Sequence, residues 1–319
     1  MIEGLAKSLI EPLSAHWRNA SLGAAASLWL TFALLFVLSH NGAADCARPG
    51  GPWCRVADNG SVGSGLILLA AAGLVIGTAF LAAGLAPGLV AAMTADFWIC
   101  QPPPLSWVCR LSIRWQRGKR GRLAARCARL SSAAGSGNGF KARRKGAVYS
   151  QLISRYPTED EWLRSSTGGN ILAAISQKIN DRLGLDLTHV WQPLVGVLSD
   201  GAADELETDS TTIAKRCQQM LIALVAFPLA GLLPWLYAVP WLALALVALV
   251  ASRQAAIAAV ATFAEHAATV VIIHRMLLYT ALRVQPPSNP AAEVASGRQL
   301  SQLLASFHNL DASPSLIYL

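Results

Sequence analysis

Long uncharged apolar runs separate the polar stretches of this chain, and their lengths predict how often it crosses a lipid bilayer. The first run spans Ala20 to Ser39, the second Val62 to Ala95 and the third Cys217 to Ser252. A helix needs roughly 20 apolar residues to cross a hydrocarbon core of about 30 Å. The first two runs therefore predict one span each, and the second is long enough to continue beyond the membrane with a kink at Pro87.

The third run is too long for one straight crossing and is interrupted by prolines. We expect two shorter spans joined between Pro234 and Pro240, with Trp235, Tyr237 and Trp241 anchored at the membrane interface. The last span reaches Arg253 after few apolar residues, and the apolar residues that follow predict that the same helix continues.

These patterns predict an all-α integral membrane protein, with four transmembrane helices in two hairpins and a helical cytoplasmic domain between them. The predicted segments are an amphipathic N-terminal segment (1–19), a first hairpin (20–96) with an external loop (41–61), a basic segment with a flexible linker (97–146), a helical domain (147–216), a second hairpin (217–252) and a cytoplasmic helical extension (253–319).

Composition agrees with a membrane protein and excludes a disordered chain or a single soluble enzyme domain. Charged residues make up 14% of the 319 residues and mean hydropathy is +0.43, whereas soluble domains carry about 25% charged residues.

The net charge of +8 is concentrated in one segment. No acidic residue lies between Asp96 and Glu159, and the stretch holds thirteen cations: Arg110, Arg114, Arg117, Lys119, Arg120, Arg122, Arg126, Arg129, Lys141, Arg143, Arg144, Lys145 and Arg155. The positive-inside rule places this segment in the cytoplasm and predicts a multi-pass membrane protein with both termini cytoplasmic. The alternative that the first span is a cleaved signal peptide stays open.

Cysteine spacing adds one candidate disulfide. Cys46 and Cys54 bracket a Pro-Gly-Gly-Pro turn in the expected external loop, so we expect a bridge, the alternative being two unpaired thiols. The cysteines on the cytoplasmic side, Cys109 among them, are expected as reduced thiols. Their spacing fits no zinc site, and we expect neither a metal nor a cofactor.

The basic stretch from Trp107 to Leu130 has cations at helical spacing and admits three interpretations. It can be a solvated helix that only fixes topology, a surface that attracts anionic inner-leaflet lipids, or, least favoured, a nucleic-acid site. The candidate lipid-facing cations are Arg117, Lys119, Arg120, Arg122 and Arg126. The Ser-, Ala- and Gly-rich residues from Ser131 to Gly139 predict a flexible linker.

Four glycines of the second span share one face of a helix. Gly73, Gly77, Gly84 and Gly88 fall within an arc of about 60° at 100° per residue. Such a face allows close helix packing. It is expected to pack either within the chain or between protomers, which makes self-association a candidate.

Polar residues follow the last span and form a candidate membrane-edge cluster: Arg253, Glu265, His266, His274, Arg275 and Tyr279. Buried structural contacts are the first interpretation, a polar conduit or gate the second and catalysis the third.

Helix signals mark the region before the second hairpin. Thr158 with the acids after it predicts a helix start, and Asn170 to Leu183 predicts a helix closed by Gly184. A second helix is expected from about Asp200 into the third apolar run. Asn170 and Asp186 are expected to cap helices or turns.

Four short motifs in this region carry a resemblance: Arg155-Tyr156-Pro157, Ser166-Thr167-Gly168-Gly169-Asn170, Leu183-Gly184-Leu185-Asp186 and Val190-Trp191-Gln192-Pro193-Leu194. Together with the sequence around His274 and Tyr279 they resemble an uncharacterised, mainly actinobacterial family of multi-span membrane proteins. The resemblance covers roughly residues 150 to 285 and implies an architecture but no activity. Ser166, Leu183 and the insertion of Gln192 depart from the family's pattern.

The sequence therefore favours a non-enzymatic integral membrane protein that acts through oligomeric assembly and encloses a polar or ion pathway. The alternative is a membrane anchor whose basic cytoplasmic domain recruits a protein or nucleic-acid partner. A membrane enzyme ranks third, because no dinucleotide fingerprint or nucleophile motif occurs.

Overall fold

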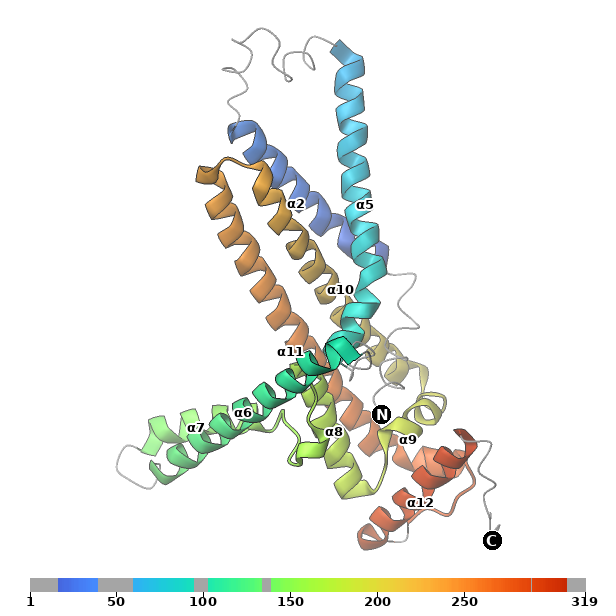
Figure 1. Ribbon diagram of the computed structural model, residues 1–319. Coiled ribbons are helices and arrows are strands. Elements are labelled where there is room, and N and C mark those ends of the chain that lie inside the picture. Colours follow the sequence, from blue (N-terminus) through green and yellow to red (C-terminus); the bar gives the residue numbers. More distant parts are fainter. Residues whose placement is uncertain (1–16, 40–59, 95–102, 134–138, 288, 309–319) are drawn as a thin grey trace. The chain divides into compact units, whose positions relative to one another are not determined.

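The computed structural model describes residues 17–39, 60–94, 103–133, 139–287 and 289–308, and these residues form helices and no strand. The longer helices are α2 (Trp17–Ser39), α5 (Gly60–Thr94), α6 (Pro103–Ala133), α7 (Gly139–Ile153), α8 (Thr167–Leu183), α9 (Leu187–Val195), α10 (Asp200–Leu229), α11 (Trp235–Ala281) and α12 (Pro290–His308). Two 3-10 turns, η3 (Asp160–Trp162) and η4 (Ala230–Leu232), complete the described elements (Figure 1). The expected all-helical fold is confirmed.

Three of the described helices are long and apolar enough to cross a membrane: Leu69–Thr94 of α5, Asp200–Leu232 of α10 with η4, and Trp235–Ala281 of α11. Helix α2 is apolar over the shorter stretch Leu22–Phe36. The chain thus has the helices of a membrane protein.

The third apolar run forms two helices as expected, but the link between them lies before the expected position between Pro234 and Pro240. Helix α10 ends at Leu229, η4 follows, and α11 begins directly after Pro234. Pro240 lies inside α11, and this helix passes Arg253 without interruption. Helix α10 begins at Asp200 and runs directly into the apolar residues, which confirms the expected helix from about Asp200 into the third apolar run.

One expected interface anchor is buried instead. Trp241 is 3% exposed and its ring nitrogen Nε1 donates a hydrogen bond of 2.7 Å to the Ala226 carbonyl oxygen. That carbonyl lies in the last turn of α10. Trp235 remains exposed. Trp241 therefore joins α11 to the last turn of α10.

The chain divides into two compact units, and the second comprises residues 12–90 and 211–259. In this unit Trp29 of α2 donates a hydrogen bond of 2.9 Å to the Thr78 hydroxyl of α5. Phe32 packs on Trp241, with ring centroids 5.7 Å apart. Alanines fill most of the remaining contacts, which allows the helices to approach closely.

The first unit contains α6 to α9, α12 and the adjoining ends of α5, α10 and α11. Gly184 ends α8 with a φ of 70°, as expected for its capping position. Helix α12 lies against this turn so closely that a Cβ at Gly297 would be 1.9 Å from the Leu183 carbonyl oxygen. Ser301 of α12 accepts a hydrogen bond of 2.9 Å from the Asp186 backbone nitrogen.

Two local expectations were wrong. The acids after Thr158 begin only the 3-10 turn η3, and Asp160 is paired with two arginines of α6. Helix α6 continues through Ser131 to Ala133, so the first residues of the expected linker are helical. Residues 134–138 lie outside the described residues.

We predict that Gly297→Ala lowers the unfolding free energy by about 1–3 kcal/mol, because the added methyl group would collide with backbone rather than with a movable side chain. Thermal unfolding of the purified protein measures the change. Gly201→Ala in α10 is the matched control, since nothing lies within 4 Å of a Cβ there. The control should raise stability slightly through helix propensity. Equal effects of the two substitutions would contradict the close docking of α12.

Candidate functional site

Helices α6 and α7 run side by side and form what we call the basic arm (Figure 1). The sequences of these two helices contain twelve of the thirteen clustered cations and no acidic residue. The arm belongs to the first unit and is the strongest concentration of like charge in the chain.

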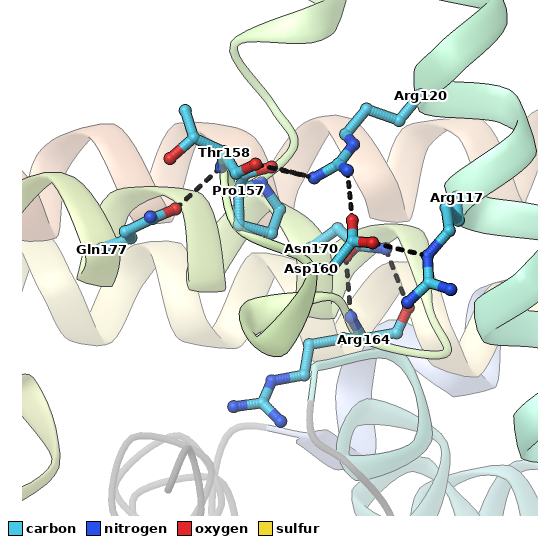
Figure 2. Close-up of polar contacts among 8 residues, drawn as sticks. All are labelled: Arg117, Arg120, Pro157, Thr158, Asp160, Arg164, Asn170 and Gln177. Atoms are coloured by element: carbon cyan, nitrogen blue, oxygen red, sulfur yellow. Dashed lines mark hydrogen bonds and ion pairs between the residues drawn. The ribbon is translucent and has the colours of Figure 1, made fainter.

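Asp160 neutralises two of these cations (Figure 2). Its carboxylate accepts from Arg117 Nε at 2.9 Å and is also paired with Arg120. Arg120 Nη1 donates further hydrogen bonds to the carbonyl oxygens of Pro157 (2.9 Å) and Thr158 (3.0 Å). Arg120 thus gathers three acceptors from the segment before α8 and attaches α6 to it.

A second set of bonds is buried deeper in the same junction. Ser112 donates a hydrogen bond of 2.6 Å to the Ser165 carbonyl oxygen, and the Tyr156 hydroxyl donates to Gln116 Oε1 at 3.2 Å. Gln116 is 2% exposed. Burial raises the pKa of the Tyr156 hydroxyl above its ordinary value, so it stays a donor at neutral pH. Ser112, Gln116 and Arg120 therefore turn one face of α6 inward.

Asn170 holds the loop that receives these contacts. Its Oδ1 accepts from the Arg164 backbone nitrogen at 2.8 Å, and its Nδ2 donates to the Arg164 carbonyl oxygen at 3.0 Å (Figure 2). The same Nδ2 donates to the Ser166 carbonyl oxygen at 2.8 Å. The side chain is fully buried. Gln177 adds a bond of 2.8 Å from the Thr158 backbone nitrogen. Asn170 therefore has the turn role of the two expected for it, because the cap of α8 is Ser166. Asp186 has the expected capping role, since it caps α9 by accepting from the Thr188 nitrogen at 2.9 Å.

The start of α8 meets the end of α5. Ser166 caps α8 by accepting a hydrogen bond of 2.9 Å from the Gly169 nitrogen, and its hydroxyl donates to the Met93 carbonyl oxygen at 2.7 Å. A Cβ at Gly168 would lie 2.4 Å from that same oxygen, so only glycine fits. The positive end of one helix dipole thus faces the negative end of another. Ser166, Gly168 and Gly169 thus lie directly against the end of α5.

The structure divides the five cations expected at a lipid surface. Arg117 and Arg120 are paired with Asp160, and Arg120 points into the junction. Arg122 and Arg126 are exposed. Lys119 lies over the Trp115 ring, 5.2 Å from its centroid, in a cation–π contact.

The expected membrane-edge cluster separates into individual contacts. His266 Nδ1 lies 2.6 Å from Asp209 Oδ2, and Arg275 pairs with Glu293 of α12. Tyr279 is 1% exposed, and its hydroxyl has no hydrogen-bond partner among the described residues. The other three members divide by exposure: Arg253 and Glu265 are exposed and His274 is half-buried.

The four glycines of α5 are exposed, and nothing lies within 4 Å of a Cβ built at any of them. The described residues therefore supply no intrachain neighbour for this face. Of the two expected roles, packing within the chain loses its support.

A cavity of about 290 Å³ lies among α2, α10 and α11 of the second unit. Its polar lining consists of Ser27, Thr31, Gln219 and Ser252, and the rest is apolar. Ser27 and Thr31 donate to carbonyl oxygens of their own helix. Few polar groups in the cavity remain to bind a solute, so the cavity gives little support to a polar pathway. The basic arm gives stronger support to a charged partner.

The cysteine expectations are partly wrong. Cys109 is disulfide-bonded rather than a thiol, and its partner lies outside the described residues. Cys127 and Cys217 carry thiols. Cys46 and Cys54 lie outside the described residues, so their expected bridge stays a prediction.

Sequence reasoning missed Asp160, Gln116 and Tyr156 as members of the junction. The signal for Asp160 is its place among the first acids after the cationic stretch, but acids at that position suit a helix start equally well. Gln116 and Tyr156 give no signal, because their pairing joins residues far apart in sequence.

The junction has the character of a structural brace. Within the described ranges no three His, Cys, Asp or Glu side chains gather as a metal site, and the Asp160 carboxylate is already engaged by two arginines. The chain matches no protein-family model, no curated protein and no solved structure. Its function must therefore be argued from these contacts, and the family resemblance stays an expectation.

We predict that Asn170→Ala lowers the unfolding free energy by about 1–3 kcal/mol, because the backbone nitrogen and carbonyl oxygen of Arg164 would lose their hydrogen bonds to the buried Asn170 side chain. Chemical denaturation of the purified protein measures this. Asn180→Ala in the same helix is the control, since the Asn180 side chain is only partly buried. If both substitutions proved neutral, the loop would not depend on Asn170.

Proposed function

We propose that this protein is a membrane anchor that presents a braced basic arm to an anionic partner at one face of the membrane. The observation that carries the proposal is the junction at Asp160, Gln116 and Asn170. It fixes one face of α6 and leaves the opposite face, with its arginines, exposed. A charged helix that only set topology would need no such attachment.

The proposed arrangement includes α2 as a fourth span, which completes two hairpins, in a bacterial plasma membrane with both termini cytoplasmic. The cation excess of the arm supports a cytoplasmic arm. The disulfide of Cys109 favours an oxidising compartment instead. We give the cations more weight, because thirteen of them lie between Asp96 and Glu159 without an acid, while the disulfide is one bond.

The arm can be tested by its affinity for a soluble polyanion. In nanodiscs of phosphatidylcholine, the full chain should bind heparin through exposed cations of the arm, which can be removed as a set of three from α6 or as a set of three from α7. Changing Arg122, Arg126 and Arg129 to Gln, or Arg143, Arg144 and Lys145 to Gln, should lower the affinity severalfold and make it less dependent on salt.

The matched control changes Arg182, Arg283 and Arg298 to Gln, which removes the same charge from positions outside the arm. This control should leave heparin affinity nearly unchanged. If it weakens binding as much as the arm variants do, net charge and not the arm attracts anions, and the proposed function is wrong.

A second candidate function is self-association through α5, and the open glycine face favours it. This face lies opposite Ala79, Ala82 and Ala86, which pack within the chain. Glycines exposed at membrane depth allow the backbone of a second helix to approach. The partner that would supply this helix is a second copy of the chain.

We predict that Gly77→Leu reduces oligomer size in mild detergent while the melting temperature of the subunit stays within a few degrees, because no intrachain atom is displaced. Light scattering with size exclusion measures the size. Ala72→Leu, exposed on α5 about 100° from the glycine face, is the control. Unchanged assembly after both substitutions would mean that the face contacts lipid.

A further inference from the structure

The outward arc of α6 changes character along its length. Counted at 100° per residue from Trp107, the arc of about 120° first carries Trp107, Leu111 and Trp115 and then Arg122, Arg126 and Arg129. The three apolar side chains are 63%, 57% and 51% exposed. Three large apolar residues in a row on one helix face are costly in water.

The arc cannot turn inward to hide them. Ser112, Gln116 and Arg120 lie on the opposite side of α6 and are bonded to Ser165, Tyr156 and Asp160. Rotating the helix to bury Trp107 or Trp115 would break these bonds. The apolar half of the arc therefore needs a partner outside the described chain.

The apolar half is also the half nearer, along the chain, to a membrane span. Helix α5 qualifies as a span up to Thr94, and α6 begins at Pro103. Tryptophan favours the boundary between hydrocarbon and headgroups. The first turns of α6 therefore follow a span closely along the chain, and the arginines come later on the same side of the helix.

From this order we infer that the outward arc of α6 docks on an anionic phospholipid surface, with its aromatic half in the interface and its arginines on headgroup phosphates. This inference rests on the proposed function and names the partner of the arm. A nucleic acid would use the arginines and could stack on the two tryptophans, but it gives Leu111 no apolar environment, whereas a bilayer accommodates all of them. Lys119, held over the Trp115 ring, lies where the two halves meet.

The test places the photoprobe p-benzoylphenylalanine at Leu111 in the full chain, in nanodiscs of phosphatidylcholine with or without phosphatidylglycerol. Mass spectrometry then counts lipid adducts after illumination. Adducts should form mainly in discs that contain phosphatidylglycerol and should decline with salt. The same probe at Ala124, which is exposed on the far side of α6, should give few adducts in either lipid.

Charge variants identify the attracting groups. With the probe at Leu111, changing Arg122, Arg126 and Arg129 to Gln should reduce adducts to the level seen in phosphatidylcholine, since each cation near such a surface favours docking about fivefold. Changing Arg143, Arg144 and Lys145 of α7 should leave the yield unchanged.

Three outcomes would overturn the inference. These are equal yields from Leu111 and Ala124, yields indifferent to phosphatidylglycerol, or loss of the Leu111 adducts when RNA is added, which would assign the arc to nucleic acid. The heparin measurement separates this inference from the proposed function. If the arm variants bind heparin severalfold more weakly, the proposed function stands whatever the lipid result. If their heparin binding is unchanged, the proposed function and the lipid inference are both wrong. An unchanged melting temperature of the arginine variant shows that the chain remains folded.

Discussion

Helix ends leave backbone groups without partners, and the contact between the end of α5 and the start of α8 is the place where this constraint organises the first unit. Ser166 provides a partner to both helix ends, because its hydroxyl oxygen accepts a hydrogen bond from the Gly169 nitrogen and its O–H donates one to the Met93 carbonyl oxygen. Gly168 permits the approach. Everything that attaches α6, from Ser112 to Arg120, binds the segment that leads into this contact.

The basic arm follows from an uneven distribution of charge. The chain places its clustered cations on α6 and α7 and supplies one described carboxylate, Asp160, to hold two of them. An exposed ion pair contributes at most about 1 kcal/mol. The attachment is therefore secured mainly by buried neutral hydrogen bonds, such as that from Tyr156 to Gln116, and the remaining cations stay available to a partner.

The sequence predicted the helices well and the contacts poorly, for physical reasons. Length and lack of charge are local properties, so the apolar helices, the uninterrupted passage of α11 beyond Arg253 and the cap at Gly184 could be anticipated. Trp241 was misplaced because an aromatic residue near a predicted boundary suits both an interface and a buried helix end. Asp160 was misassigned because its arginine partners lie about forty residues away, where no periodicity connects them.

The contact between Gly184 and Gly297 restricts how the two positions can change in evolution. A Cβ at either position would collide with backbone atoms of the other segment, 2.0 Å from the Val294 oxygen in one case and 1.9 Å from the Leu183 oxygen in the other. The two positions therefore form a single unit of evolutionary change. A relative that carries a side chain at one of them must have moved α12 away from the turn. Paired glycines at this separation are thus a mark by which distant relatives that keep the same docking can be recognised, even where the rest of the sequence has diverged.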